Sequence, residues 1–440
     1  MRILLVNPSI TARPDQLIVG KVPTGLLYVA ATLRAAGHDV QVCDCMAGGR
    51  IVLSRPDIIG ISCNYTVAYN NAARFATEMK TIYPDARIVM GGVHATVDYE
   101  NILKNPNVDA VIRGDGEYAM IDYVENGKWD DARHEVADLD ALPFPARELV
   151  NMEWYMNHPM SYIASKRRPT CDIITSRGCP FACTFCSVRG SYRTRSPENV
   201  LDEMGVLIKR YGIREFRVID DNFAYDRERA IAICEGILNR GYDITWDAPN
   251  GLALATLDPE LLFWMKQGGF YKLILGIESG SPRTLKAMHK PVDLDKARRI
   301  IDVANQLGIW TWSTFIIGYP DETAEDIEET MRFIESAGLN MVSIYIAQPL
   351  LGTAIYDQYD HSGEHGFTNF FNPTYDTNHF TAAELAGKRN QMFKRFFRGR
   401  ALRYLNPHRL NTELLTRLHG KEDIAYFIRQ LRNFVNKKGW

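Results

Sequence analysis

Short hydrophobic runs alternate with stretches of helical periodicity from residue 2 to about residue 120. Residues 23–37 have the spacing of an amphipathic helix that ends at a glycine, and residues 63–84 predict a second long helix. The hydrophobic runs predict five strands, at residues 2–7, 39–44, 57–62, 86–92 and 110–117. Because alternating strands and helices favour right-handed crossovers, we expect an N-terminal Rossmann-like, doubly wound parallel sheet.

A second series of strands and helices begins near residue 171. Helical stretches such as residues 197–212 and 324–338 separate the hydrophobic runs of this series. Six strands are predicted, at residues 171–178, 215–222, 244–250, 272–280, 310–320 and 342–349. Six units are fewer than the eight of a closed barrel, so the pattern predicts a partial (β/α)6 TIM-type barrel with its chemistry at the carboxyl ends of the strands.

The whole pattern is that of an α/β protein with a helical C-terminal extension. We expect a Rossmann-like domain at residues 1–136, a proline-bearing linker at 137–170, the partial barrel at 171–360 and a basic helical extension at 361–440. The extension interleaves aromatic with basic residues, including Phe393, Phe396 and Phe397. We expect its aromatic side chains to pack on the barrel and its arginines to lie in solvent.

Composition excludes some partners. Lysines and arginines number 51 and acidic residues 53, so the formal charge of −2 gives no reason to expect nucleic acid or an anionic membrane as a partner. The apolar run at residues 3–6 stops at Asn7 and is too short for a signal peptide or a membrane span. We therefore expect a cytoplasmic protein without a membrane span, in which thiols stay reduced and clustered cysteines bind metal.

Three cysteines stand close together after the first strand of the second series. Cys179, Cys183 and Cys186 have the spacing C-x3-C-x2-C. A structural zinc site needs four ligands, but no second Cys-x-x-Cys follows, and the pair His361 and His365 lies far downstream. Buried structural thiols are a further alternative. Three thiolates without a fourth suit a [4Fe–4S] cluster with one open iron that coordinates a small molecule.

The stretch at residues 179–186 resembles the signature of the radical S-adenosylmethionine (radical SAM) superfamily. The resemblance implies reductive cleavage of SAM at the open iron, which gives a 5′-deoxyadenosyl radical that abstracts a substrate hydrogen. Phe185 matches the aromatic position near the adenine. Strand-end segments at 276–280 and 315–323 support the resemblance, with Gly276, Glu278, Ser279 and Gly318 as expected SAM contacts. Asp220 and Asp221 end the second strand, facing the same mouth, and are candidate catalytic residues.

The first domain resembles the B12 (cobalamin)-binding domain that precedes the barrel in one branch of this superfamily. The resemblance implies that cobalamin accepts a methyl group from one SAM and donates it to a substrate radical. The expected contacts lie at strand ends, at Ser62, Gly91, Gly92 and His94. Two features depart from the pattern. The sequence lacks Asp-x-His-x-x-Gly, and residues 45–56 leave little room for a crossover helix between the second and third strands.

These resemblances predict a radical SAM enzyme with a [4Fe–4S] cluster, SAM and cobalamin, which methylates an unactivated carbon of a small polar substrate. An external one-electron reductant of flavodoxin or ferredoxin type is expected as a partner. One alternative is a cobalamin-free dehydratase, epimerase or rearrangement enzyme of natural-product biosynthesis, for example on a sugar, with a degenerate B12 domain. An alternative of another class is a non-enzymatic iron–sulfur protein for electron transfer or sensing.

Overall fold

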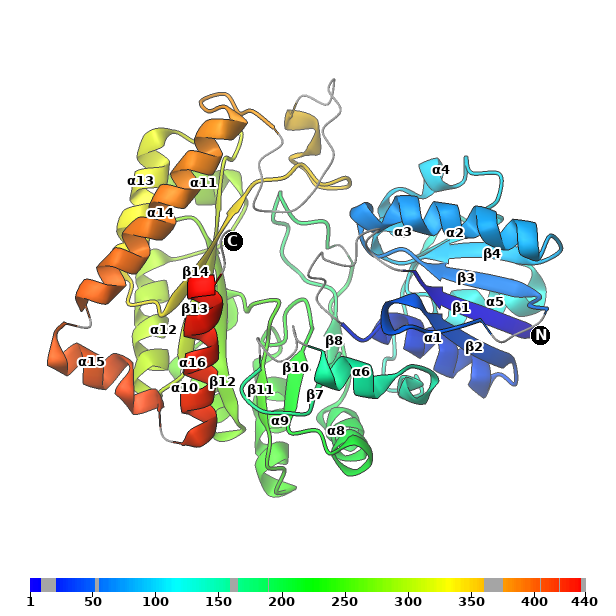
Figure 1. Ribbon diagram of the computed structural model, residues 1–440, viewed down its shortest axis with the longest axis horizontal. Coiled ribbons are helices and arrows are strands. Elements are labelled where there is room, and N and C mark those ends of the chain that lie inside the picture. Colours follow the sequence, from blue (N-terminus) through cyan, green and yellow to red (C-terminus); the bar gives the residue numbers. More distant parts are fainter. Residues whose placement is uncertain are drawn as a thin grey trace. The chain divides into compact units, whose positions relative to one another are not determined.

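The chain forms two compact units, Met1–Ala164 and Ser165–Trp440, in a computed structural model (Figure 1). The structure describes residues 1–8, 21–51, 55–158, 165–188, 190–359, 375–403, 405–418 and 420–436. The boundary between the units falls inside the expected linker at 137–170. The expected histidine pair, His361 and His365, and the start of the C-terminal extension lie outside the described residues.

The first unit is built on a parallel sheet. Its strands are β1 (Arg2–Asn7), β2 (Asp39–Asp44), β3 (Ile58–Ser62), β4 (Arg87–Gly91), β5 (Ala110–Gly114) and the two-residue β6 (Arg133–His134). Their order is β2-β1-β3-β4-β5-β6, and every pair is parallel. The order therefore reverses between β1 and β3, which is where ligands bind in doubly wound sheets.

The helices of this unit are α1 (Thr24–Ala35), α2 (Tyr69–Ile82), α3 (Val93–Val97), α4 (Tyr99–Ile102), α5 (Glu117–Asn126) and α6 (Met152–Asn157). Those that pack on the sheet cover both of its faces. Figure 1 shows α2 and α3 on the face opposite α1. The strands between them are almost fully buried, which explains their continuous hydrophobic runs.

The connection from β2 to β3 is short, as residues 45–56 predict. A 3-10 helix, Cys45–Ala47, is its only helix within the described residues. Cys45 and Ile51 pack against the buried hydrophobic cluster on that side of the sheet. The chain thus covers this part of the core with side chains of the connection itself.

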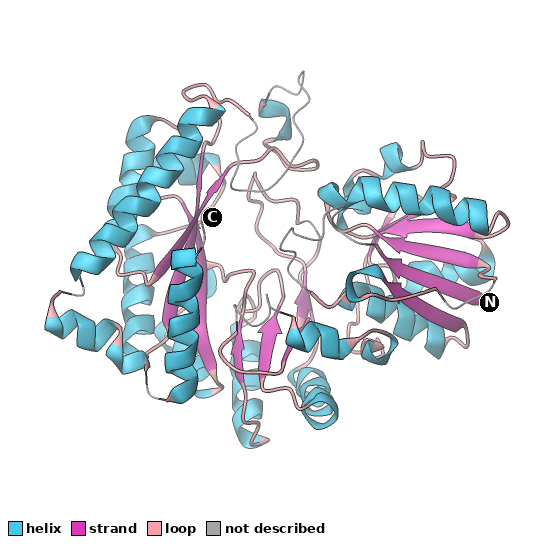
Figure 2. Ribbon diagram, in the orientation of Figure 1, coloured by secondary structure: helices cyan, strands magenta, loops and turns pink. Residues whose placement is uncertain are grey.

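The second unit is an open parallel sheet with helices between its strands (Figure 2). Its strands are β7 (Thr170–Ile173), β10 (Glu215–Val218), β11 (Thr245–Asp247), β12 (Phe270–Glu278), β13 (Trp310–Ile317) and β14 (Met341–Ile346), in the order β14-β13-β12-β11-β10-β7. The intervening helices are α8 (Pro197–Tyr211), α9 (Arg227–Asn239), α10 (Pro259–Gln267), α11 (Pro282–Ala287), α12 (Leu294–Gln306) and α13 (Ala324–Ser336). Both predicted sheets are confirmed, and with them the fold class.

The C-terminal helices are α14 (Ala382–Arg403), α15 (Pro407–Glu413) and α16 (Lys421–Asn436). Phe396 of α14 is buried, as expected for an aromatic that packs on the barrel. The expectation that the arginines of this segment lie in solvent is wrong for Arg389 and Arg400, which are both buried. Arg389 donates from Nε to the carbonyl of Ile344 at 2.8 Å, so it ties α14 to β14 at the open edge of the sheet.

Candidate functional site

The cysteine loop is closed at its base by a short antiparallel ladder. The sequence predicted one strand over residues 171–178, but β7 ends at Ile173, and β8 (Ser176–Arg177) pairs with β9 (Arg193–Thr194). Gly178 follows with a φ of 80°, and a Cβ there would collide with the carbonyl oxygen of Ser191. Glycine is required at this position because the two ends of the loop approach each other so closely.

The three cysteines of the loop are free thiols. Burial raises the pKa of Cys183, which the charge of Lys290 opposes, while Glu278 and Cys179 raise it further. Burial also raises the pKa of Cys186, and the charges of Cys183 and Cys179 add to the rise. The three thiols therefore lie within electrostatic reach of one another.

This donor set fits an iron–sulfur cluster. In the part of the chain that the structure describes, no three His, Cys, Asp or Glu side chains converge on a position for one metal ion. A cubane cluster binds each cysteine through a different iron, so its ligands need not converge in this way. Three neighbouring free thiols on one glycine-framed loop match that requirement.

The middle of the loop is fastened to the end of α11 and to the segment after β14. The Thr184 amide donates to the carbonyl of Met288 at 3.0 Å, and its hydroxyl contacts the Tyr319 hydroxyl. The Ile355 amide donates to the carbonyl of Thr184 at 3.2 Å. Next to Thr184, Phe185 packs against an apolar cluster that contains Met288, Tyr319 and Ile355. The loop thus presents Phe185 to an apolar wall beside the cysteines.

Asp220 lies beneath the loop and is fully engaged. Its carboxylate accepts hydrogen bonds from the Thr175 amide at 2.6 Å, the Thr175 hydroxyl at 2.5 Å and the Ser176 hydroxyl at 2.7 Å. Its neighbour Asp221 accepts from the Gly178 amide at 3.0 Å and contributes to the raised pKa of Cys186. Both carboxylates therefore hold the base of the cysteine loop.

Glu278 ends β12 in a strained conformation. Its φ of 71° lies in the left-handed region, and the register shifts between Gly276 and Glu278. Its carboxylate accepts from the Thr314 hydroxyl at 3.1 Å and lies 3.7 Å from the Lys290 ammonium. Burial raises the pKa of Glu278, and Lys290 and Thr314 oppose the rise. Backbone strain of this kind persists only where the surrounding packing holds it in place, and it occurs most often at functional sites.

Gly276 leaves room for these groups. A Cβ there would lie 2.7 Å from Glu278 Oε1 and 3.3 Å from Lys290 Nζ. Ser279, in contrast, is fully buried and lies 3.1 Å from the Thr330 hydroxyl, so it anchors the turn to α13.

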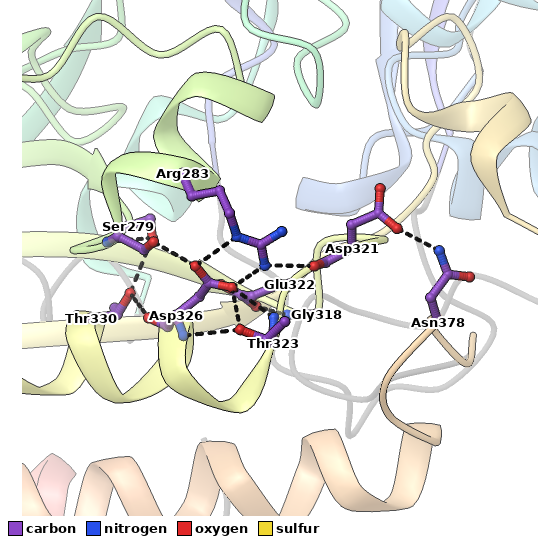
Figure 3. Close-up of polar contacts among 10 residues, drawn as sticks. Ser279, Arg283, Gly318, Asp321, Glu322, Thr323, Asp326, Thr330 and Asn378 are labelled. Carbon is purple, nitrogen blue, oxygen red and sulfur yellow. Dashed lines mark hydrogen bonds and ion pairs between the residues drawn. The ribbon is translucent and has the colours of Figure 1, made fainter.

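The loop after β13 is held by a network of carboxylates and donors (Figure 3). Gly318 has a φ of 78° and donates from its amide to Glu322 at 2.6 Å. Burial raises the pKa of Glu322 to about 8, although backbone amides of Gly318 and Tyr319 oppose the rise. Asp326 caps α13 and contacts Arg283. Burial raises the pKa of Asp326, but the hydrogen-bond donors around its carboxylate outweigh burial and hold the pKa well below the ordinary value.

In the first unit, the candidate residues lie at the carboxyl edge of the sheet. Gly92 has a φ of 114°, and a Cβ there would lie 2.6 Å from Asn64 Oδ1. Ser62 accepts from the Asn64 side chain at 3.0 Å, and Gly91 is the last residue of β4. Three apolar side chains just beyond β3, β4 and β5 remain about half exposed, namely Tyr65, Val93 and Tyr118. A glycine cradle beside exposed apolar side chains fits the face of a corrin.

His94 is only 4% exposed at this edge. Its Nδ1 lies 3.3 Å from the Thr66 hydroxyl, and its Nε2 lies 3.4 Å from Asp98. Burial lowers the pKa of His94, and the charge of Asp98 opposes this. Nδ1 therefore has a partner in the loop, whereas Nε2 lies near Asp98 without a hydrogen bond among the described residues.

Lys290 is the main residue of the site that sequence reasoning missed. It follows His289, whose φ of 48° makes it, with Glu278, one of two non-glycine residues with positive φ in the described segments. Neither hydrophobic periodicity nor a short motif signals such a turn. Only the fold brings Lys290 to Glu278 and to the cysteines.

Two domain families match the chain. The B12 binding domain matches residues 22–124, and the radical SAM superfamily matches residues 173–334. An uncharacterized methyltransferase of Pyrococcus horikoshii is 32% identical over 81% of this chain and 83% of that protein. Cytidylyl-2-hydroxyethylphosphonate methyltransferase of Streptomyces wedmorensis is 30% identical over 80% of each chain.

A solved structure shares the fold. It is the radical S-adenosylmethionine methyltransferase TsrM of Kitasatospora setae with cobalamin and a [4Fe–4S] cluster bound. Its TM-score is 0.64 at 16% identity, over 81% of this chain and 78% of that one. No helix among the described residues is long and apolar enough to cross a membrane.

These matches confirm the predicted fold class and enzyme class, and they support the predicted cofactors, a [4Fe–4S] cluster, SAM and cobalamin. The roles of the individual site residues stay predictions. The chain belongs to the radical SAM superfamily, in the branch that carries an N-terminal B12-binding domain.

Proposed function

We propose that this enzyme is a cobalamin-dependent radical SAM methyltransferase that methylates an unactivated carbon of a small polar molecule. The observation that carries the proposal is the presence of a B12-binding domain and a three-cysteine loop on one chain, together with two relatives over four-fifths of its length that are named methyltransferases. When bound, the cluster, SAM and cobalamin supply the radical and the methyl group. The chain supplies binding, orientation and exclusion of water.

We assign Cys179, Cys183 and Cys186 as the three cluster ligands. Their unpaired thiols and mutual electrostatic influence support this assignment. Because burial raises the pKa of Cys183 and Cys186, bare thiols would stay protonated, and iron would displace their protons on binding. Asp220 and Asp221 hold the base of the loop, so we propose that they position the cluster rather than transfer protons.

We assign the SAM site to the loop ends around Phe185, Gly276, Glu278 and Gly318. The apolar wall beside Phe185 suits an adenine ring. The buried Glu278 carboxylate suits the ammonium or the ribose hydroxyls of SAM, because a charge so desolvated binds a cation strongly. Ser279 supports Glu278 through its contact with Thr330.

We assign the corrin to the carboxyl edge of the first sheet, around Ser62, Gly91 and Gly92. The exposed side chains of Tyr65 and Val93 support this, since an apolar ring face would cover them. His94 is buried between Thr66 and Asp98, so we propose that it shapes the loop beside the corrin.

Further features of the proposal concern substrate, partner and compartment. Polar side chains after the barrel strands suggest a substrate with hydroxyl or amine groups, namely Asn250, Tyr319 and Gln348. Asp247, predicted with them, instead lies buried at the end of β11 and pairs with Lys272 at 2.5 Å. We propose a flavodoxin-type or ferredoxin-type protein as the reductant and the cytoplasm as the compartment, with no nucleic-acid partner.

Retention of corrin tests the proposal. Protein made in cells supplied with hydroxocobalamin and then desalted should keep nearly one corrin per chain, read from its visible spectrum. Reduced, cluster-loaded enzyme with SAM should then release both S-adenosylhomocysteine and 5′-deoxyadenosine. Release of 5′-deoxyadenosine without retained corrin would refute the methyltransferase and favour the cobalamin-free dehydratase, epimerase or rearrangement enzyme.

A cysteine variant tests the radical step. Cys183→Ala should abolish 5′-deoxyadenosine, whereas Cys234→Ala, which replaces a buried thiol outside the loop, should keep the cluster absorption. Absence of 5′-deoxyadenosine from the cluster-loaded wild-type enzyme would instead favour a non-enzymatic iron–sulfur protein.

A further inference from the structure

A cavity of about 320 Å³ lies at the amino ends of β13 and β14, enclosed by α14 and α16. Five aromatic side chains form its walls, namely Trp310, Trp312, Phe397, Tyr426 and Phe427. Its volume falls in the range of small-molecule sites. No residue of the cysteine loop or of the SAM site contributes to its walls.

The walls are flat and apolar. The Trp310 ring stacks on Phe427 with centroids 5.9 Å apart and an interplanar angle of 12°, and Tyr426 meets Trp310 edge-on at 6.1 Å. Trp310 and Trp312 both lie on β13, an inner strand of the sheet, yet are only half-buried. Aromatic rings that line a cavity favour a flat apolar ligand that packs against them.

One wall carries an unused hydrogen-bond donor. Asn340 is 7% exposed, and its Oδ1 accepts from the Thr311 amide at 2.8 Å and the Thr311 hydroxyl at 3.0 Å. These donors fix the orientation of the amide, so Nδ2 is the free end. Among the described residues Nδ2 has no partner. A buried donor without a partner is costly, and a ligand with an acceptor would satisfy it.

The charges of the lining point to an anion. Among the described residues of the lining, Lys272 and Arg400 carry a charge, both are basic, and none is a carboxylate. Lys272 is paired with Asp247 at 2.5 Å, so the attraction it adds is partial. The Asn340 amide remains the directional contact, and the basic residues favour an acceptor that is negatively charged.

The cavity and the cluster loop lie at opposite ends of β13. Trp312 and Gly318 are six residues apart along an extended strand, which corresponds to about 20 Å. A ligand in the cavity therefore does not contact the reacting atoms. We propose that this cavity is a second ligand site, which binds a flat, apolar organic anion through the aromatic walls and Asn340 Nδ2.

Two dyes that differ in charge test the site. Anilinonaphthalene sulfonate is flat and anionic, and phenylnaphthylamine is its neutral counterpart. The cluster-loaded enzyme should bind one anilinonaphthalene sulfonate per chain, with energy transfer from tryptophan because Trp310 and Trp312 line the cavity. Absence of saturable binding would overturn the proposal.

Two pairs of measurements localise the binding. Ala401→Phe should weaken binding of both dyes about tenfold by filling the cavity, whereas Leu402→Phe, on the exposed side of the same helix, should not. Asn340→Asp keeps the acceptor for Thr311 but replaces the donor with an oxygen, so it should weaken only the anionic dye, by about tenfold.

Equal effects of Ala401→Phe and Leu402→Phe, or equal weakening of both dyes by Asn340→Asp, would overturn the assignment. Unchanged 5′-deoxyadenosine release and thermal unfolding in Ala401→Phe would show that the variant is folded and would attribute its weaker dye binding to the cavity. A loss of folding in Ala401→Phe would leave Asn340→Asp and the two dyes as the deciding comparison.

Discussion

Replacement of Glu322 by glutamine should make the enzyme less sensitive to alkaline pH. Glu322 is 2% exposed, and its Oε1 has no hydrogen-bond partner among the described residues. Burial raises the pKa of Glu322 from 4.5 to about 8, so the folded state favours the protonated carboxyl. A glutamine keeps an oxygen for the Gly318 amide and carries no titrating proton.

The sign and size of the pH effect on the unfolding free energy follow from the linkage between proton binding and folding. Because the folded pKa lies above the unfolded value, the stability is fully present below about pH 4.5 and is lost as pH rises through about 8. With these two values, the wild-type protein should lose about 3 kcal/mol of unfolding free energy between pH 6 and pH 9 through this one group. Glu322→Gln should lack this loss.

Urea unfolding of the cluster-loaded protein under anaerobic conditions, at pH 6, 7.5 and 9, measures the difference between the two proteins. Tryptophan fluorescence follows the unfolding, and Trp246 and Trp310 contribute the signal of the second unit. The control is Glu325→Gln, one turn along the same segment, whose side chain is 70% exposed and whose pH profile should parallel that of the wild type. Parallel profiles for Glu322→Gln and wild type would refute the reasoning.

Three further changes test the site residues. Gly92→Ala places a Cβ 2.6 Å from Asn64 Oδ1 at a φ of 114°, so corrin retention should fall while 5′-deoxyadenosine release is kept. The control Gly25→Ala, whose Cβ meets no atom within 4 Å, should change neither quantity. Asp220→Asn should lower the unfolding free energy by about 1–3 kcal/mol, because it removes a charged acceptor of three buried hydrogen bonds. Because Asp220 positions the loop, the variant should also reduce 5′-deoxyadenosine release by the same factor at every pH. An altered pH profile would favour proton transfer by Asp220 instead. Lys290→Gln removes a positive charge near Cys183, so it should shift the midpoint potential of the cluster to more negative values by a few tens of millivolts, where about 59 mV is 1.4 kcal/mol for one electron. The control Lys286→Gln, at the exposed end of α11, should leave the potential unchanged. Equal potentials in both variants would contradict the proximity of Lys290 to Cys183.

The amino-acid sequence by itself determined the elements and their order. The strands β1 to β5 and the six barrel strands appear where hydrophobic runs predict them, because burial on both faces of a parallel sheet imposes a local and continuous pattern. The cysteine trio also stands within eight residues, so its spacing is legible without a fold. The short β8 and β9 escaped prediction, since two residues are too few to show a period.

Only the tertiary structure decided what the charged residues do. The sequence made Asp220 a candidate catalytic residue at a strand end, but Thr175 and Ser176, more than forty positions earlier, donate hydrogen bonds to both of its oxygens. Lys290 carries no motif, and a positive-φ turn brings it to Glu278. The aromatic cavity joins strands near residue 310 to helices beyond residue 390. Hydrophobic periodicity records each residue's own burial, whereas an ion pair or a cavity wall depends on a partner distant in sequence, and only folding brings the two together.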